Sequence, residues 1–133
     1  MRFELLRRCA LAVGAMDTVT GLFLIAVPQW TLRLMLIDQV PEQLVFVRWV
    51  GVFVAGVGLL YFLPELRYRG ALRELAYDMV LTATAMIRLM VMAFVTTAIL
   101  VGMLEPAWIT VAITDGILGL AQLWIIKRRP SHA

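Results

Sequence analysis

Four ionisable residues interrupt the apolar stretches of this 133-residue chain, and their positions make them the side chains best able to do chemistry. Asp17, Arg48, Arg88 and Asp115 each lie in a different apolar segment. A charge at the centre of a bilayer costs about 2.5–3.5 kcal/mol on insertion scales, so such residues face the protein interior and pair with one another. The sequence therefore predicts a charge cluster inside a helical bundle, either as a binding site or as structural ion pairs.

The rise of a helix places three of these charges close to mid-depth and Arg48 only about 6 Å from the end of its segment. We expect Arg88 to bridge Asp115, Asp17 or both, with Arg48 capping from outside. If Arg48 does not supply the fourth charge, one aspartate must be partly protonated, which would make a proton-binding site. The alternative is static pairs that fix helix register. Three further side chains are candidates to line a pocket beside the cluster: Trp49, Thr84 and Tyr61.

The chain has the composition of a membrane protein. Hydrophobic residues make up 62% of it, whereas soluble domains have about 45–50% apolar residues. A transmembrane helix needs about 20 mostly apolar residues, and four segments qualify: 9–27, 44–63, 79–104 and 107–126. We therefore predict an all-α membrane protein, a single four-transmembrane-helix bundle over residues 1–133.

Proline and glycine suggest where the helices begin and end. The first helix should begin near Phe3 and stop at Pro28, and an interfacial helix or loop should follow over residues 30–38. Proline favours the first turn of a helix, so Pro41 should open the second helix, which should end at Pro64. The third helix should begin near Gly70 and end around residue 105, and a fourth should follow from residue 106.

Basic residues orient the predicted bundle. They form three clusters, at residues 2–8, 67–73 and 127–129, while the other two connections hold one basic residue, Arg33. An even number of spans puts all three clusters on one side, and the positive-inside rule makes that side cytoplasmic. We expect both termini in the cytoplasm and the chain in the bacterial cytoplasmic (inner) membrane. Basic residues at helix ends give no reason to expect nucleic-acid binding.

Small residues mark the faces on which membrane helices approach one another closely. Gly14 and Gly21 share a face with Asp17, because residues three or four apart lie on one side of a helix. The pattern Asp-x-x-x-Gly-Leu occurs at 17–22 and again at 115–120. The residues predicted to pack helix against helix are Gly14, Gly21, Gly51, Ala55, Gly116 and Gly119.

The residue inventory argues against several kinds of catalytic centre. One cysteine, Cys9, and one histidine, His132, leave no set of ligands for zinc, copper or bis-histidine haem. Neither a nucleophile–base pair nor a phosphate-binding loop is visible. We therefore expect no metal and no evident cofactor, with a quinone or a bound lipid still possible, and we do not expect catalysis by this chain alone.

A family resemblance rests on residues 21–36, on Arg48-Trp49-Val50-Gly51 through Gly58, and on the helix that carries Asp115 and Gly116. Across most of its length the chain resembles the DoxX-like group of small four-helix membrane proteins. The resemblance implies a membrane accessory subunit, and some members are associated with quinone-linked oxidoreductases.

Three functions remain open, and the lack of a catalytic set favours the first. The chain is an accessory or scaffold subunit of a larger membrane complex, a quinone- or lipid-binding component of an oxidoreductase, or a dimeric proton-coupled transporter. The last would resemble the small multidrug transporters, with Asp17 as the acid of the first helix, although this chain also has charges on every other helix. Its expected partners are the lipid bilayer and either other membrane subunits or copies of itself.

Overall fold

The computed structural model describes residues 3–129, whose regular elements are all helices and which contain no strand; Arg2 and His132 lie outside this range. The elements are α1 (Phe3–Ala26), α2 (Pro28–Leu34), α3 (Leu44–Leu60), α4 (Leu63–Arg67), α5 (Gly70–Leu100), the 3-10 helix η1 (Pro106–Trp108) and α6 (Ile109–Arg128). Three helices, α1, α5 and η1 together with α6, are long and apolar enough to cross a membrane. The prediction of an all-helical integral membrane protein is confirmed at this level.

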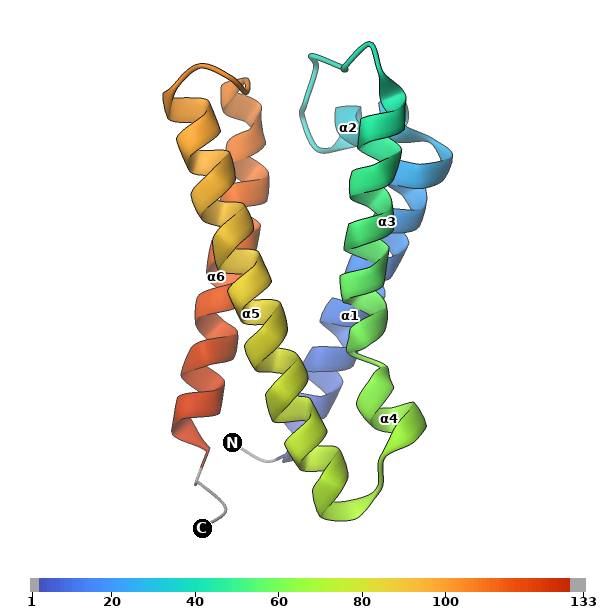
Figure 1. Cartoon of the computed structure of the whole chain (residues 1–133), viewed down its shortest axis with the longest axis vertical. Helices are drawn as coiled ribbons and strands as arrows, with labels where there is room; N and C mark the ends of the chain where they lie inside the picture. The colour runs from blue at the N-terminus through green and yellow to red at the C-terminus, as the bar shows by residue number, and fades with distance from the viewer. Residues whose placement is uncertain (1–2, 130–133) are drawn as a thin grey trace.

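The four longer helices form two antiparallel pairs, α1 with α3 and α5 with α6 (Figure 1). Contact is extensive within each pair and much sparser between the pairs. The first turn of α1, helix α4 and the last turn of α6 lie at one end of the bundle, called here the α4 end. Helices α2 and η1 lie at the opposite end, called the α2 end.

Glycine allows the α1 and α3 backbones to approach closely. A Cβ atom on Gly21 would lie 2.5 Å from the Gly51 carbonyl oxygen, and one on Gly14 would lie 2.8 Å from that of Gly58. In the other pair, a Cβ on Gly116 would meet the Met92 side chain at 2.6 Å rather than a backbone atom. The predicted small residues thus lie in the two seams: Gly14, Gly21, Gly51 and Ala55 between α1 and α3, and Gly116 and Gly119 between α6 and α5.

Several predicted helix boundaries are wrong. Helix α3 begins at Leu44 rather than at Pro41, and it ends at Leu60 rather than near Pro64. Proline has no N–H to bond to the carbonyl four residues earlier and its ring clashes there, so Pro64 prevents α3 from continuing and instead lies in the first turn of α4.

Helix α5 also ends earlier than the predicted span 79–104, at Leu100. Gly102 has a φ of 77°, and its N–H donates to the Ile99 carbonyl while the Met103 N–H donates to the Ala98 carbonyl. These bonds form a Schellman motif, which closes a helix with a glycine in the left-handed region. Residues 101–104 therefore belong to the turn before η1.

Two apolar clusters lie toward the two ends of the bundle. The cluster toward the α4 end contains Leu6, Ala10, Tyr61, Tyr77 and Leu81, with partly buried side chains such as Ile125 packed against it. The cluster toward the α2 end contains Leu24, Leu32, Ile37 and Val47. Buried polar side chains connect the two helix pairs at the level of Asp17 and Arg88, between these clusters.

The α1–α3 seam can be tested with two glycines. Gly21→Ala places a methyl group against the α3 backbone, and overpacking of this kind costs about 1–3 kcal/mol. Gly56→Ala is the matched control, because a Cβ there meets nothing within 4 Å. Unfolding by sodium dodecyl sulfate, followed by circular dichroism, should show a loss of stability for Gly21→Ala alone. Equal midpoints for both variants would contradict the close approach.

Candidate functional site: a buried arginine between two aspartates

Arg88 on α5 is the centre of the polar interior, and only 5% of its side chain is exposed. Its Nη1 donates to Asp115 Oδ1 on α6 at 2.5 Å, and its Nη2 donates to Asp17 Oδ2 on α1. The expected bridge from Arg88 to both aspartates is thus present. Hydrogen bonds between ionised partners are about twice as strong as neutral ones, so this triad is a strong polar link between the two helix pairs.

A neutral network extends from the triad toward the α4 end. Arg88 Nε donates to the Tyr61 hydroxyl at 3.4 Å, and Gln122 Nε2 donates to the same oxygen. The Thr84 hydroxyl donates to the Val80 carbonyl at 2.8 Å and lies 3.5 Å from Gln122 Oε1. Tyr61 follows the last residue of α3, so the complete network joins the four longer helices.

Helical spacing brings these residues together. Thr84 and Arg88 are four apart on α5, and Asp115 and Gln122 are seven apart on α6, so each pair lies on one helix face. Asp17 lies between Gly14 and Gly21 on the buried face of α1. Sequence reasoning missed Gln122, although an amide one heptad after Asp115 on the same face was a usable signal.

Arg48 does not belong to this cluster, which corrects the four-charge expectation. Its side chain is exposed toward the α2 end, and Nη1 donates to the Ile25 carbonyl at 2.6 Å. The last carbonyls of a helix lack intrahelical partners and carry partial negative charge, which a cation stabilises. Arg48 therefore caps α1, and the triad keeps two carboxylates for one guanidinium, which leaves one unbalanced negative charge when both aspartates are ionised.

The three candidate pocket residues do not surround a common space. Tyr61 and Thr84 are completely buried within the network. Trp49 faces outward on α3, 60% exposed, with its ring edge-to-face against Phe53 at a centroid distance of 5.0 Å. The hydroxyls of Thr84 and Thr18 both donate to backbone carbonyls of their own helices, as threonines in membrane helices commonly do.

A second ionic cluster surrounds Glu65 on α4. Its carboxylate accepts hydrogen bonds from Arg7 Nε at 2.6 Å, from the Tyr77 hydroxyl at 2.8 Å and from Arg73 Nη1 at 3.5 Å. Burial raises the pKa of Glu65, but the hydrogen bonds from Arg7 and Tyr77 outweigh burial and lower it. Sequence reasoning treated these bases only as orientation signals, although one acid within a basic stretch was a hint of pairing.

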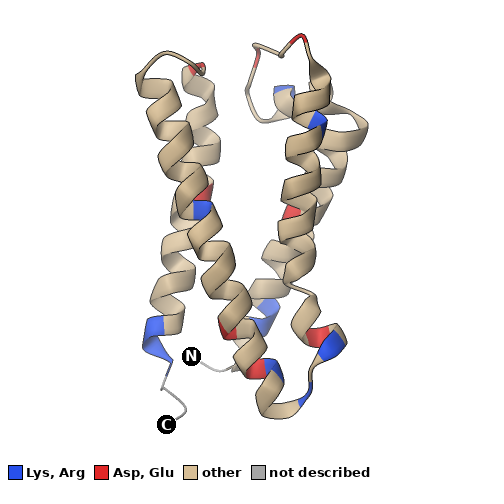
Figure 2. Ribbon diagram, viewed as in Figure 1, with Lys and Arg blue, Asp and Glu red and all other residues tan. Residues whose placement is uncertain are grey.

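Figure 2 shows how the charges are distributed over the ribbon, with many at the α4 end and few at mid-height. Arg129 also takes part at the α4 end, where it donates to Glu74 at 3.1 Å and to Asp78. Within residues 3–129, no group of three or more histidine, cysteine, aspartate or glutamate side chains is arranged to hold a metal ion. Arginine–carboxylate chemistry therefore dominates both clusters.

The geometry thus defines a helical integral membrane protein with an arginine held between two acids in its interior. Comparison with protein-family models, with curated proteins and with solved structures finds no match to this chain. The DoxX-like resemblance stays a prediction.

Removal of the central guanidinium should destabilise the bundle. Arg88→Ala strands the buried carboxylate of Asp17 and the partly buried one of Asp115, and breaking a buried ion pair costs about 3–5 kcal/mol. Arg33→Ala, at an exposed position on α2, is the control and should leave stability nearly unchanged. Equal unfolding midpoints of Arg88→Ala and Arg33→Ala in detergent would rule out the buried bridge. If adding Asp17→Asn and Asp115→Asn partly restores the stability of Arg88→Ala, the unpaired carboxylate charge is the cause of the loss.

The Glu65 cluster should lose stability in acid. The pKa of Glu65 is lowered from its ordinary value of 4.5, so its contribution is complete above the unfolded pKa and disappears as the pH falls through the folded one. Exposed pairs contribute about 0.2–1 kcal/mol each, so the effect should be modest. Thermal unfolding of the wild type should approach that of Glu65→Gln as the pH falls. A difference that stays constant however far the pH falls below 4.5, while the protein is still folded, would contradict this role.

Proposed function

We propose that the chain crosses the bacterial cytoplasmic membrane four times, with both termini in the cytoplasm. Helix α3 has 17 residues, which lies at the lower limit for a membrane span of about 17–25 residues, and it lies alongside α1 (Figure 1). The concentration of lysine and arginine at the α4 end supports a cytoplasmic location for that end.

We further propose that the protein is a non-catalytic accessory or scaffold subunit of a larger membrane complex, as the DoxX-like resemblance implies. The observation that carries this proposal is the closed polar network. Arg88, both aspartates, Tyr61 and Gln122 are engaged with one another, so the interior polar groups serve helix association and are not directed at a substrate. Such groups specify which helices meet and in which register.

A dimeric proton-coupled transporter is the second candidate, and one observation favours it. The triad has one more acid than base, so a single proton would neutralise it and weaken one of the two ion pairs. The sparse contact between the helix pairs would let them move apart. A quinone site is favoured least, because Trp49 is exposed on the outer surface of α3, whereas Tyr61 is buried in the network around Arg88.

Native mass spectrometry of the tagged protein, expressed at its natural level and extracted in mild detergent, distinguishes these functions. Heavier unrelated subunits in a fixed ratio are the expected result for an accessory subunit. A homodimer without other subunits would contradict it. Such a dimer would be tested for proton uptake in vesicles, with Asp38→Asn as the exposed control. Uptake that is abolished by Asp115→Asn but not by Asp38→Asn would favour the transporter function over the scaffold function.

A further inference from the structure

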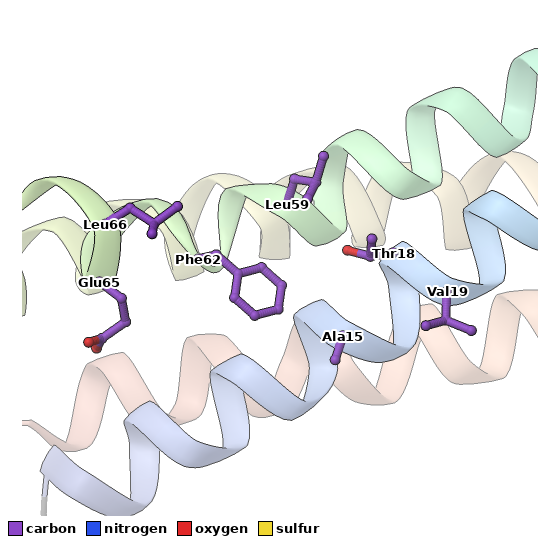
Figure 3. A pocket seen from close by; sticks show the side chains of 7 residues that line it. All are labelled: Ala15, Thr18, Val19, Leu59, Phe62, Glu65 and Leu66. Carbon is purple, nitrogen blue, oxygen red and sulfur yellow. The ribbon is translucent and has the colours of Figure 1, made fainter.

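An open groove lies on the outer surface of the α1–α3 pair. Its volume is about 470 Å³, and it runs between α1 and the segment that leads from the end of α3 into α4. In Figure 3 the Phe62 ring lies between Glu65 at one end and Thr18 and Val19 at the other. The lining residues are Ala15, Thr18, Val19, Leu59, Phe62, Glu65 and Leu66.

The groove exists because α3 stops early. Beside it, the backbones cross closely where a Cβ on Gly58 would lie 2.5 Å from the Thr18 nitrogen. Two residues later α3 ends, and Pro64 directs the chain into α4. The α1 surface around Ala15 is therefore left uncovered, and the small alanine side chain does not fill the space.

The groove wall offers hydrocarbon and no free hydrogen-bonding group. The Thr18 hydroxyl donates to the Gly14 carbonyl at 2.7 Å. Glu65, at the end of the groove, is already engaged by Arg7 and Tyr77. An apolar chain would fit this wall without leaving a buried polar group unpaired, as a polar ligand would.

Uncompensated positive charge follows the apolar lining at the α4 end. Arg67 comes directly after Leu66 and Arg69 follows two residues later; both are exposed, and neither forms an ion pair within residues 3–129. The charge of Glu65 is balanced by Arg7 and Arg73, so it does not offset these two bases. An apolar groove that ends beside free cations at a membrane interface matches an amphiphile with a negatively charged head.

We propose that this groove binds an anionic phospholipid, with one acyl chain along Ala15 and Phe62 and the phosphate at Arg67 and Arg69. The lipid comes from the leaflet at the α4 end, because Glu65 and Leu66 of the groove and the neighbouring Arg67 belong to α4. This inference rests on the proposed membrane topology but not on the accessory role. The lipid would stay bound in the groove between α1 and α4.

Lipid retention tests the proposal. The intact protein is reconstituted in nanodiscs with equal phosphatidylglycerol and phosphatidylethanolamine, transferred to mild detergent, and examined by native mass spectrometry. The wild type should keep phosphatidylglycerol. Ala15→Phe, which fills the groove, should lose it severalfold, whereas Ala83→Phe, at an exposed position on α5, should not. Arg67→Gln with Arg69→Gln should abolish the preference for the anionic lipid while leaving the helical circular dichroism unchanged.

Equal retention by Ala15→Phe and Ala83→Phe would overturn the site, and so would equal retention of both lipids by the wild type. A second protein chain bound in the groove in place of lipid would also overturn it. Failure of the chain to insert into the membrane would be visible beforehand as extraction of the protein from membranes by alkaline carbonate. Failure of the accessory role would change the co-purifying subunits and leave the lipid result unaffected.

Discussion

A guanidinium in an apolar interior is the constraint on which the rest of this structure depends. A bilayer interior offers Arg88 no water, so its charge and its donors must be matched by groups on neighbouring helices. Asp17 on α1 and Asp115 on α6 supply that match, each at a different guanidinium nitrogen. Each helix pair contributes one of the two acids, so the requirement to satisfy one arginine also sets how the pairs are positioned.

The two helix pairs pack through different kinds of contact. Glycines allow α1 and α3 to meet backbone to backbone, whereas Met92 and Leu89 fill the space beside the α6 glycines. Apolar clusters then join the elements toward each end of the bundle. Contact between small residues holds the helices of a pair together, and the polar network sets the orientation of one pair relative to the other. Apolar contacts alone would specify that orientation weakly, because the surrounding lipid is equally apolar.

The parts of the structure set by local spacing could be predicted from the sequence. Hydropathy predicted the long helices, and the cost of a buried charge predicted that Arg88 meets the aspartates. The position of Arg48 could not be predicted in this way, because depth along a helix does not determine which direction a long side chain takes. The end of α3 depends on how Pro64 redirects the chain, and the Glu65 cluster depends on contacts between segments far apart in the sequence. The spacing of residues along the sequence does not reveal either.

The orientation of the two helix pairs tests the role of Arg88 most directly. Spin labels replace Val52 on α3 and Phe94 on α5, both exposed, in a Cys9→Ser background, and their separation is measured by pulsed electron paramagnetic resonance with and without Arg88→Met. Labels at Phe94 and Ile113, within one pair, serve as the control. We predict a narrow distribution between the pairs that broadens when Arg88 is removed, while the control distribution stays unchanged. An unaltered distance distribution between the pairs in Arg88→Met would contradict the role of Arg88 in fixing their orientation.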